Sequence, residues 1–250
     1  MIRGILFSLC ATLLLAIGAG AQNRQFPLKT IQNQCIDFQD LKRGKESWEI
    51  RDCRVSEFGE FGTVAGKVYY YATYCIIPNG SDPGTCGDTS FTARYHQSRG
   101  LAVFEFARAT NQASLLFERV NPDIGIMVYS DKPAIIRNQF GTLLYLPIRV
   151  DGTGNMNASE YYVRQNGKWE RLDSESWLSD LTRRIPRGLE LWKGVWPDLH
   201  TMRAEAAFYR RNDAGCCPSG GIARIRLSIR AKKFILQSVV VDTTTLIRAP

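Results

Sequence analysis

The sequence is poor in the residues and motifs that specify catalysis. It has only two histidines, His96 and His200, and they lie in different segments. Asp198 and His200 are close enough in sequence to offer two ligands, but a zinc site needs three or four. The chain has no Gly-x-Ser-x-Gly sequence and no Cys-x-x-Cys pair, the signatures of many serine hydrolases and thiol oxidoreductases. We therefore predict no catalytic residue, no cofactor and no metal site.

Residues 151–157 have the acidic and amide side chains of a calcium loop, but they depart from its pattern. Met156 stands where such a loop needs glycine, and Tyr162 stands where it needs glutamate. We interpret this run as a turn that joins two strands.

Long apolar runs are also scarce, and the one that exists lies at the N-terminus. Arg3 precedes an apolar stretch that ends in the small residues Ala19-Gly20-Ala21. A positive charge, an apolar stretch and an A-x-A sequence, in that order, indicate a secretory signal that is cleaved after Ala21. We expect residues 1–21 to be this signal and residues 22–250 to be a periplasmic or secreted chain with no transmembrane segment.

Seven cysteines are present, and Cys10 would be lost with the signal. The six that would remain are Cys35, Cys53, Cys75, Cys86, Cys216 and Cys217. An even number in an exported chain favours disulfides over free thiols. Cys75 and Cys86 flank a turn-rich loop, and Cys35 with Cys53 is the next simplest pair. Adjacent cysteines rarely join each other. An alternative is therefore a crossed arrangement, in which Cys216 and Cys217 bond to separate partners. A redox role would require these two to cycle.

The chain predicts a mainly β fold of antiparallel sheets, as a sandwich or as two packed lobes that divide near residues 121–135. Strand patterns begin at Thr63, whereas the polar residues 22–34 are expected to form a loose arm. Asn166-Gly167 indicates a hairpin with a type I′ turn. Three strands are expected at 202–210, 222–231 and 234–242, after one amphipathic helix near 174–185.

Positive charge is in excess, with 32 lysines and arginines against 24 acidic residues. In one predicted strand, period-two alternation puts Ile225, Leu227 and Ile229 on one face. The opposite face and the connection after it would carry Arg224, Arg226, Arg230, Lys232 and Lys233. This face is either a solvated surface or a site for an anionic envelope polymer or an acidic partner protein. No feature indicates nucleic-acid binding.

One segment resembles a known pattern. Cys216-Cys217-Pro218-Ser219-Gly220 resembles a motif of uncharacterised bacterial exported proteins, and the last fifth of the chain is similar to the C-terminal part of lipoproteins of the LppP/LprE type. The resemblance implies a cell-envelope protein and supplies no activity. Those lipoproteins have an acceptor cysteine after the signal, which this chain lacks, so a lipid anchor is not expected.

These observations favour a non-enzymatic binding or interaction module of the cell envelope, stabilised by disulfides. The alternative is an envelope hydrolase that acts on peptidoglycan or another glycan, because Trp177, Trp192 and Trp196 would suit stacking on sugars as well as core packing. A pocket with two carboxylates about 5–9 Å apart would favour the hydrolase.

Overall fold

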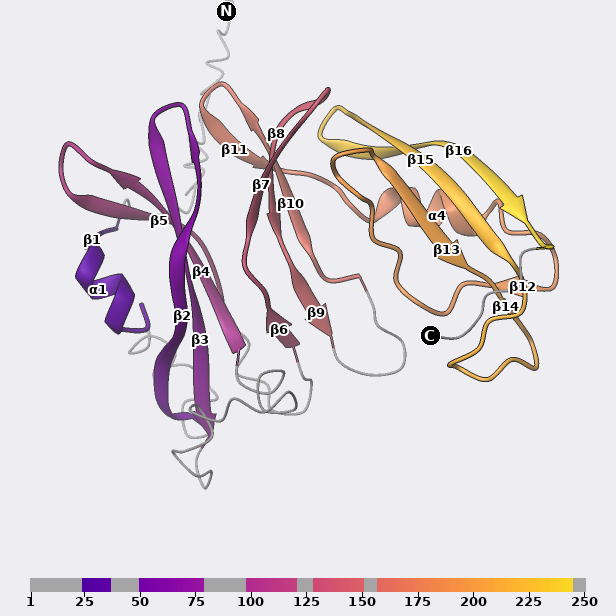
Figure 1. Cartoon of the computed structure of the whole chain (residues 1–250), viewed down its shortest axis with the longest axis horizontal. Helices are drawn as coiled ribbons and strands as arrows, with labels where there is room; N and C mark the ends of the chain where they lie inside the picture. The colour runs from indigo at the N-terminus through magenta and orange to yellow at the C-terminus, as the bar shows by residue number, and fades with distance from the viewer. Residues whose placement is uncertain (1–23, 37–49, 79–97, 121–127, 151–156, 245–250) are drawn as a thin grey trace, which may run out of the picture.

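The computed structural model describes residues 24–36, 50–78, 98–120, 128–150 and 157–244. The predicted signal, His96 and Cys86 lie outside these ranges. Within them the chain is mainly β, as predicted, and its antiparallel sheets stack side by side in layers (Figure 1). In the same ranges, no helix has the length and apolar character needed to cross a membrane.

The first layer is a five-stranded antiparallel sheet in the order β1-β5-β4-β3-β2. Its strands are β1 (Gln25–Pro27), β2 (Ile50–Val64), β3 (Lys67–Pro78), β4 (Ser98–Ala107) and β5 (Gln112–Val120). Strand β2 precedes the point at which the sequence predicts the first strand. Its alternation is hidden by Gly59 and Gly62 and by three register shifts against β3, at each of which the inward and outward positions exchange.

The expectation of a loose arm at residues 22–34 is wrong for the part that the structure describes, which begins at residue 24. Phe26 in β1 pairs with Ala113 of β5, and helix α1 (Leu28–Asn33) follows at once. Ile31 of this helix is fully buried against the outer face of the first sheet. A disulfide from Cys35 to Cys53 then ties the end of the helix to β2. This polar segment is ordered with few apolar side chains, because strand pairing with β5 holds one end and the disulfide holds the other.

The second layer is a four-stranded sheet, and it is buried on both faces. It contains β7 (Ala134–Asn138), β8 (Gly141–Leu146), β10 (Glu160–Gln165) and β11 (Lys168–Arg171). Leu144 and Leu146 face the first sheet, whereas Leu143 faces the C-terminal layer. Asn166 and Gly167 both have positive φ, of 49° and 78°, so the predicted type I′ hairpin is confirmed.

Strands β6 (Val128–Ser130) and β9 (Ile148–Val150) pair with each other beside these two layers. The C-terminal layer is a three-stranded sheet in the order β13-β15-β16, and the strand predicted at 202–210 is divided, because its last two residues join a separate pair of strands. Its strands are β13 (Arg203–Ala207), β15 (Ile222–Arg230) and β16 (Lys233–Asp242), and a smaller pair, β12 (Leu189–Glu190) and β14 (Tyr209–Arg210), adjoins it.

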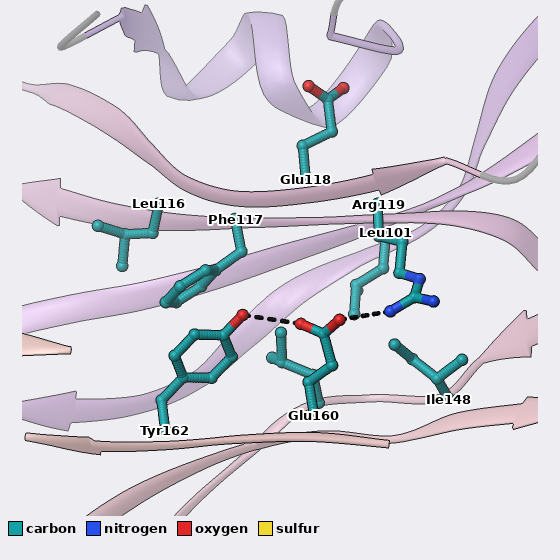
Figure 2. A pocket seen from close by; sticks show the side chains of 9 residues that line it. Leu101, Leu116, Phe117, Glu118, Arg119, Ile148, Glu160 and Tyr162 are labelled. Atoms are coloured by element: carbon teal, nitrogen blue, oxygen red, sulfur yellow. Dashed lines mark hydrogen bonds and ion pairs between the residues drawn. The ribbon is translucent and has the colours of Figure 1, made fainter. Parts of the chain in front are cut away.

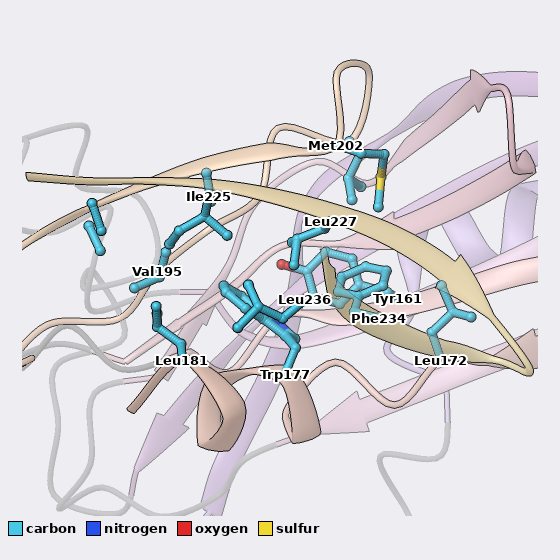
Figure 3. Packing of buried hydrophobic residues seen from close by; sticks show 14 of the residues in the cluster. Tyr161, Leu172, Trp177, Leu181, Val195, Met202, Ile225, Leu227, Phe234 and Leu236 are labelled. Carbon is cyan, nitrogen blue, oxygen red and sulfur yellow. The ribbon is translucent and has the colours of Figure 1, made fainter. Parts of the chain in front are cut away.

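The predicted amphipathic helix is present as α4 (Ser176–Thr182), with hydrogen-bonded turns continuing to Ile185. The Asp173 carboxylate accepts hydrogen bonds from the backbone N–H groups of Glu175 and Ser176, which lie at the helix start. The bond from Ser176 is the main reason that the pKa of Asp173 lies below its ordinary value. Figure 3 shows Trp177 and Leu181 pointing from α4 into the core beneath β15 and β16.

One predicted disulfide is present, and one pair of cysteines bonds in a way that the sequence did not favour. Cys35 joins Cys53, as predicted, across a separation of 18 residues. A loop of that size is expected to stabilise the fold by about 3 kcal/mol. Cys75 is also disulfide-bonded, and Cys86, its predicted partner, lies outside the described residues. Cys216 and Cys217 bond to each other, so the crossed arrangement is not the one formed.

The predicted division near residues 121–135 lies partly outside the described residues and stays a prediction. Apolar contacts nevertheless run across it. Tyr71, Leu101 and Val103 of the first sheet pack against Leu144 and Tyr162 of the second. These contacts place two walls of side chains opposite each other, and the candidate site lies between them.

Candidate ligand-binding site

A cavity of about 430 Å³ lies between the first and second sheets (Figure 2). The apolar side chains that line it are Leu101, Leu116, Phe117, Leu146 and Ile148. Phe117 from β5 and Tyr162 from β10 approach with ring centroids 4.1 Å apart, so aromatic surface from both sheets forms one wall. The remaining lining consists of charged residues, which gather around Glu160.

The wall on β5 owes its shape to a bulge. Val103 of β4 lies opposite Phe117 and Phe104 lies opposite Leu115, so Leu116 is an extra residue without a partner in the ladder. Because of this insertion, Leu116 and Phe117 both join the core between the two sheets, while Leu115 packs on the α1 side. Two consecutive large apolar residues therefore face the cavity, which a regular strand would not allow.

Glu160 is the polar centre of the site. It begins β10, its side chain is 14% exposed, and its carboxylate forms an ion pair with Arg119 of β5. Tyr162 donates its hydroxyl hydrogen to the same carboxylate over 2.7 Å, and an Arg171 nitrogen lies 3.5 Å from it. Burial, and then the contact with Glu160, raises the pKa of Tyr162, which favours the protonated phenol that donates to this carboxylate.

The charges around Glu160 do not cancel. Arg119 and Arg171 both reach the one carboxylate of Glu160, so two positive charges share a single negative charge at this contact. The Arg119 side chain is 50% exposed, and a guanidinium has five N–H donors, of which the hydrogen bond to Glu160 occupies one. The remaining donors of Arg119 are available to an anionic group that enters from solvent.

The lining does not provide the pair of carboxylates that glycan hydrolysis needs. Glu118 is the second acidic residue of the lining, but its side chain points away from Glu160, toward the α1 side of the sheet (Figure 2). Leu115, which also lies on that side, marks the same face of the strand. The arrangement can hold a ligand by apolar contact and by charge, and it presents a single carboxylate to it.

A second polar cluster lies elsewhere between the same two sheets. Tyr69 of β3 donates to Glu105 of β4 over 2.8 Å and accepts from Arg164 of β10 over 2.6 Å. Lys67 forms an ion pair with Glu105. Burial, followed by the contact with Glu105, raises the pKa of Tyr69 to about 12. These contacts fix one sheet relative to the other, and so they fix the width of the space between them.

The predicted arginine face has the expected geometry. Arg224, Arg226 and Arg230 are exposed on β15, whereas Ile225 and Leu227 are buried beneath it. Arg203 of β13 lies directly opposite Arg226 in the ladder, so two like charges are neighbours there. Within the described part of the chain, neither Arg226 nor Arg230 forms an ion pair.

The other positive residues of this surface are paired with acidic ones. Arg224 lies 3.6 Å from Glu205 and 3.8 Å from Asp242. Lys232 lies 2.5 Å from Glu170, and Lys233 lies 3.5 Å from Asp173. The surface is therefore less uniformly positive than the sequence suggests, because acidic residues from other segments come to lie beside three of its five cations.

The described residues contain no cluster of three or more side chains suited to a metal ion. The Asp198 carboxylate accepts hydrogen bonds from the His200 backbone N–H and from the Thr201 hydroxyl, so it shapes a turn. Asn157, at the end of the run that resembles a calcium loop, uses its amide to bind the backbone of Val195 over 2.6 and 2.7 Å. The rest of that run lies outside the described residues.

Sequence reasoning did not identify the cavity or its charged residues. Arg119 and Glu160 are 41 positions apart, and each looks like an ordinary polar residue at a strand end. One signal was present. Leu115-Leu116-Phe117 interrupts the alternation of an otherwise amphipathic strand, as a bulge between two buried faces does.

No protein-family model matches this chain, and no curated protein matches it. The function is therefore inferred from the residues that line the cavity.

Proposed function

We propose that this chain is an exported, non-enzymatic binding protein of the cell envelope, and that it holds a small amphipathic anion in the cavity beside Arg119. The apolar part of the ligand lies between Phe117 and Leu146, and its anionic group meets the free donors of Arg119. The observation that carries the proposal is the cavity of about 430 Å³ in which apolar side chains from both sheets lie beside Arg119, which shares the Glu160 carboxylate with Arg171. Small-molecule sites commonly have volumes of 300–1,000 Å³, with a few polar groups that fix orientation.

Three features support export and binding over catalysis. The N-terminal sequence has the order of a cleavable signal. The Cys35–Cys53 disulfide suits an oxidising compartment. The lining has two acidic residues, but the Glu118 side chain points away from Glu160, whereas a glycan hydrolase acting on peptidoglycan or a similar polymer needs two carboxylates that face one ligand.

The export part of the proposal predicts where the mature chain begins. Intact-mass measurement of the protein recovered from the envelope or medium of an expressing bacterium should correspond to a chain that starts at Gln22. An unprocessed chain that starts at Met1 in that fraction would contradict cleavage after Ala21.

The binding part predicts a preference for anions with an apolar tail. By titration calorimetry, decanoate should bind once per chain and about tenfold more tightly than decanol, because a charge-assisted hydrogen bond adds at least 1.4 kcal/mol. Arg119→Gln should remove that preference while leaving decanol binding unchanged. Leu116→Trp should weaken both ligands, because the larger ring fills the cavity.

The matched control is the triple variant Arg224→Gln, Arg226→Gln and Arg230→Gln, which removes exposed arginines far from the cavity. It should bind decanoate as the wild type does. Loss of binding in this variant alone would move the site to the arginine face. Cleavage of peptidoglycan by the wild type, abolished by Glu160→Gln, would overturn the non-enzymatic proposal.

A further inference from the structure

The Cys216–Cys217 disulfide lies in an exposed loop between β14 and β15, and both cysteines are exposed. The other disulfide-bonded cysteines of the described chain are less accessible. Cys35 and Cys53 pack against the core of the first sheet, and Cys75 is 2% exposed. A thiolate in solution therefore reaches Cys216 and Cys217 more easily than it reaches Cys35, Cys53 or Cys75.

This disulfide also has little to contribute to the stability of the fold. A cross-link restricts the unfolded chain according to the number of residues in the loop that it closes. The separation is 18 residues for Cys35–Cys53 and one for Cys216–Cys217. A bond between neighbours closes the smallest possible loop, so a purely structural role explains it poorly.

The loop is held by hydrogen bonds that do not involve sulfur. The Asp213 carboxylate accepts from the backbone N–H groups of Arg210 and Ser219 and from the Ser219 hydroxyl, each over 2.7 Å. Beyond the loop, Gly220 donates its backbone N–H to the Phe208 carbonyl over 2.8 Å. Breaking the sulfur–sulfur bond leaves these anchors in place, so the domain can stay folded with the loop reduced.

A chain of contacts leads from the disulfide to an exposed aromatic side chain. Gly215, next to Cys216, accepts a hydrogen bond from the Tyr209 hydroxyl over 3.1 Å. The Tyr209 ring is stacked on Trp192 with centroids 4.6 Å apart and planes within 9°. Trp192 is 38% exposed. These two contacts connect the backbone next to Cys216 with Trp192 through the Tyr209 side chain.

We propose that Cys216–Cys217 is a thiol–disulfide exchange site that accepts two electrons from a dithiol, and that its state sets the packing of Trp192 on Tyr209. One thiolate of the dithiol attacks a cysteine sulfur, the Cys216–Cys217 bond breaks, and the released thiolate takes up a proton. The second thiol of the dithiol loses its proton and attacks the dithiol's own sulfur in the mixed disulfide, so that the bond to the protein breaks and the second cysteine thiolate leaves and takes up a proton. The products are two protein thiols and an oxidised dithiol. This site is independent of the cavity beside Arg119.

The test equilibrates the purified mature protein with mixtures of reduced and oxidised dithiothreitol, followed by alkylation and peptide mass mapping. Cys216 and Cys217 should become alkylated together at a reduced-to-oxidised ratio at least about tenfold lower than Cys35 and Cys53 need. Circular dichroism should show a folded protein at that ratio, and oxidised glutathione should restore the disulfide. Opening at the same ratio as Cys35–Cys53, or only after unfolding, would overturn the proposal.

Tryptophan fluorescence tests the link to Trp192. The emission of the wild type should change when Cys216–Cys217 opens, and the Trp192→Phe variant should lose that change. The double variant Cys216→Ser and Cys217→Ser should be folded and should have the emission of the reduced wild type under oxidising conditions. An unchanged wild-type spectrum, or a change that persists in Trp192→Phe, would overturn the transmission through Tyr209.

Discussion

Replacing Trp177 with alanine should lower the free energy of unfolding by about 3–5 kcal/mol. The side chain is 1% exposed and lies in the cluster shared by α4, the second sheet and the C-terminal sheet (Figure 3). Its indole nitrogen also donates to the Ser174 carbonyl over 2.8 Å. The substitution therefore leaves both a cavity and an unpaired carbonyl group, since alanine replaces neither the volume nor the donor.

Urea unfolding followed by far-ultraviolet circular dichroism measures this loss, with the slope of the transition unchanged if the native state stays compact. Trp192→Ala is the matched control, because Trp192 is partly exposed. Among the described residues, Tyr209 is the aromatic side chain on which it stacks. This variant should lower the free energy of unfolding by about 1 kcal/mol. Equal losses for the two variants would contradict the place of Trp177 in the core.

Alanine at Gly221 should also be strongly destabilising, by about 3 kcal/mol or more, since strain at a special backbone position adds to a steric clash. Gly221 has a φ of 94°, which L side chains rarely adopt. A Cβ there would lie 2.2 Å from the carbonyl oxygen of Asp242 and 2.6 Å from the Cα of Thr243. Both are backbone atoms, so no flexible side chain can move aside.

Gly167→Ala separates the two causes. Gly167 has a φ of 78°, but a Cβ there would meet nothing within 4 Å. The Gly167→Ala variant should lose only about 1–2 kcal/mol of stability, because backbone strain is the single cause. Thermal unfolding of the two variants compares them directly. A Gly221→Ala variant no less stable than Gly167→Ala would show that β16 is not packed against this turn.

The fold class could be read from the sequence where period and turn chemistry agree. Asn166-Gly167 fixes its hairpin because few other pairs tolerate positive φ at both positions. The strand of Arg224 and Ile225 is equally clear, since one of its faces is solvated and the other buried. In these places a local pattern carries the structural information.

The sequence could not reveal features that depend on distant contacts. Strand β2 contains Gly59 and Gly62 and changes register three times, so its period is lost. Helix α1 is too short to be stable alone, and it forms because Ile31 meets the first sheet and Cys35 is bonded to Cys53. The candidate site has the same origin, because two sheets must pack before Arg119 meets Glu160.

The double burial of the second sheet makes the two ends of the chain depend on each other. One face of β8 needs Leu101 and Val103 from the N-terminal half as cover, and the other needs Ile225 and Phe234 from the last quarter. A nascent chain that has emerged only as far as α4 would leave Leu143 and Tyr161 without the C-terminal strands that cover them. Translation that stops early would thus yield an aggregation-prone chain with exposed apolar surface, which chaperones and proteases would have to remove.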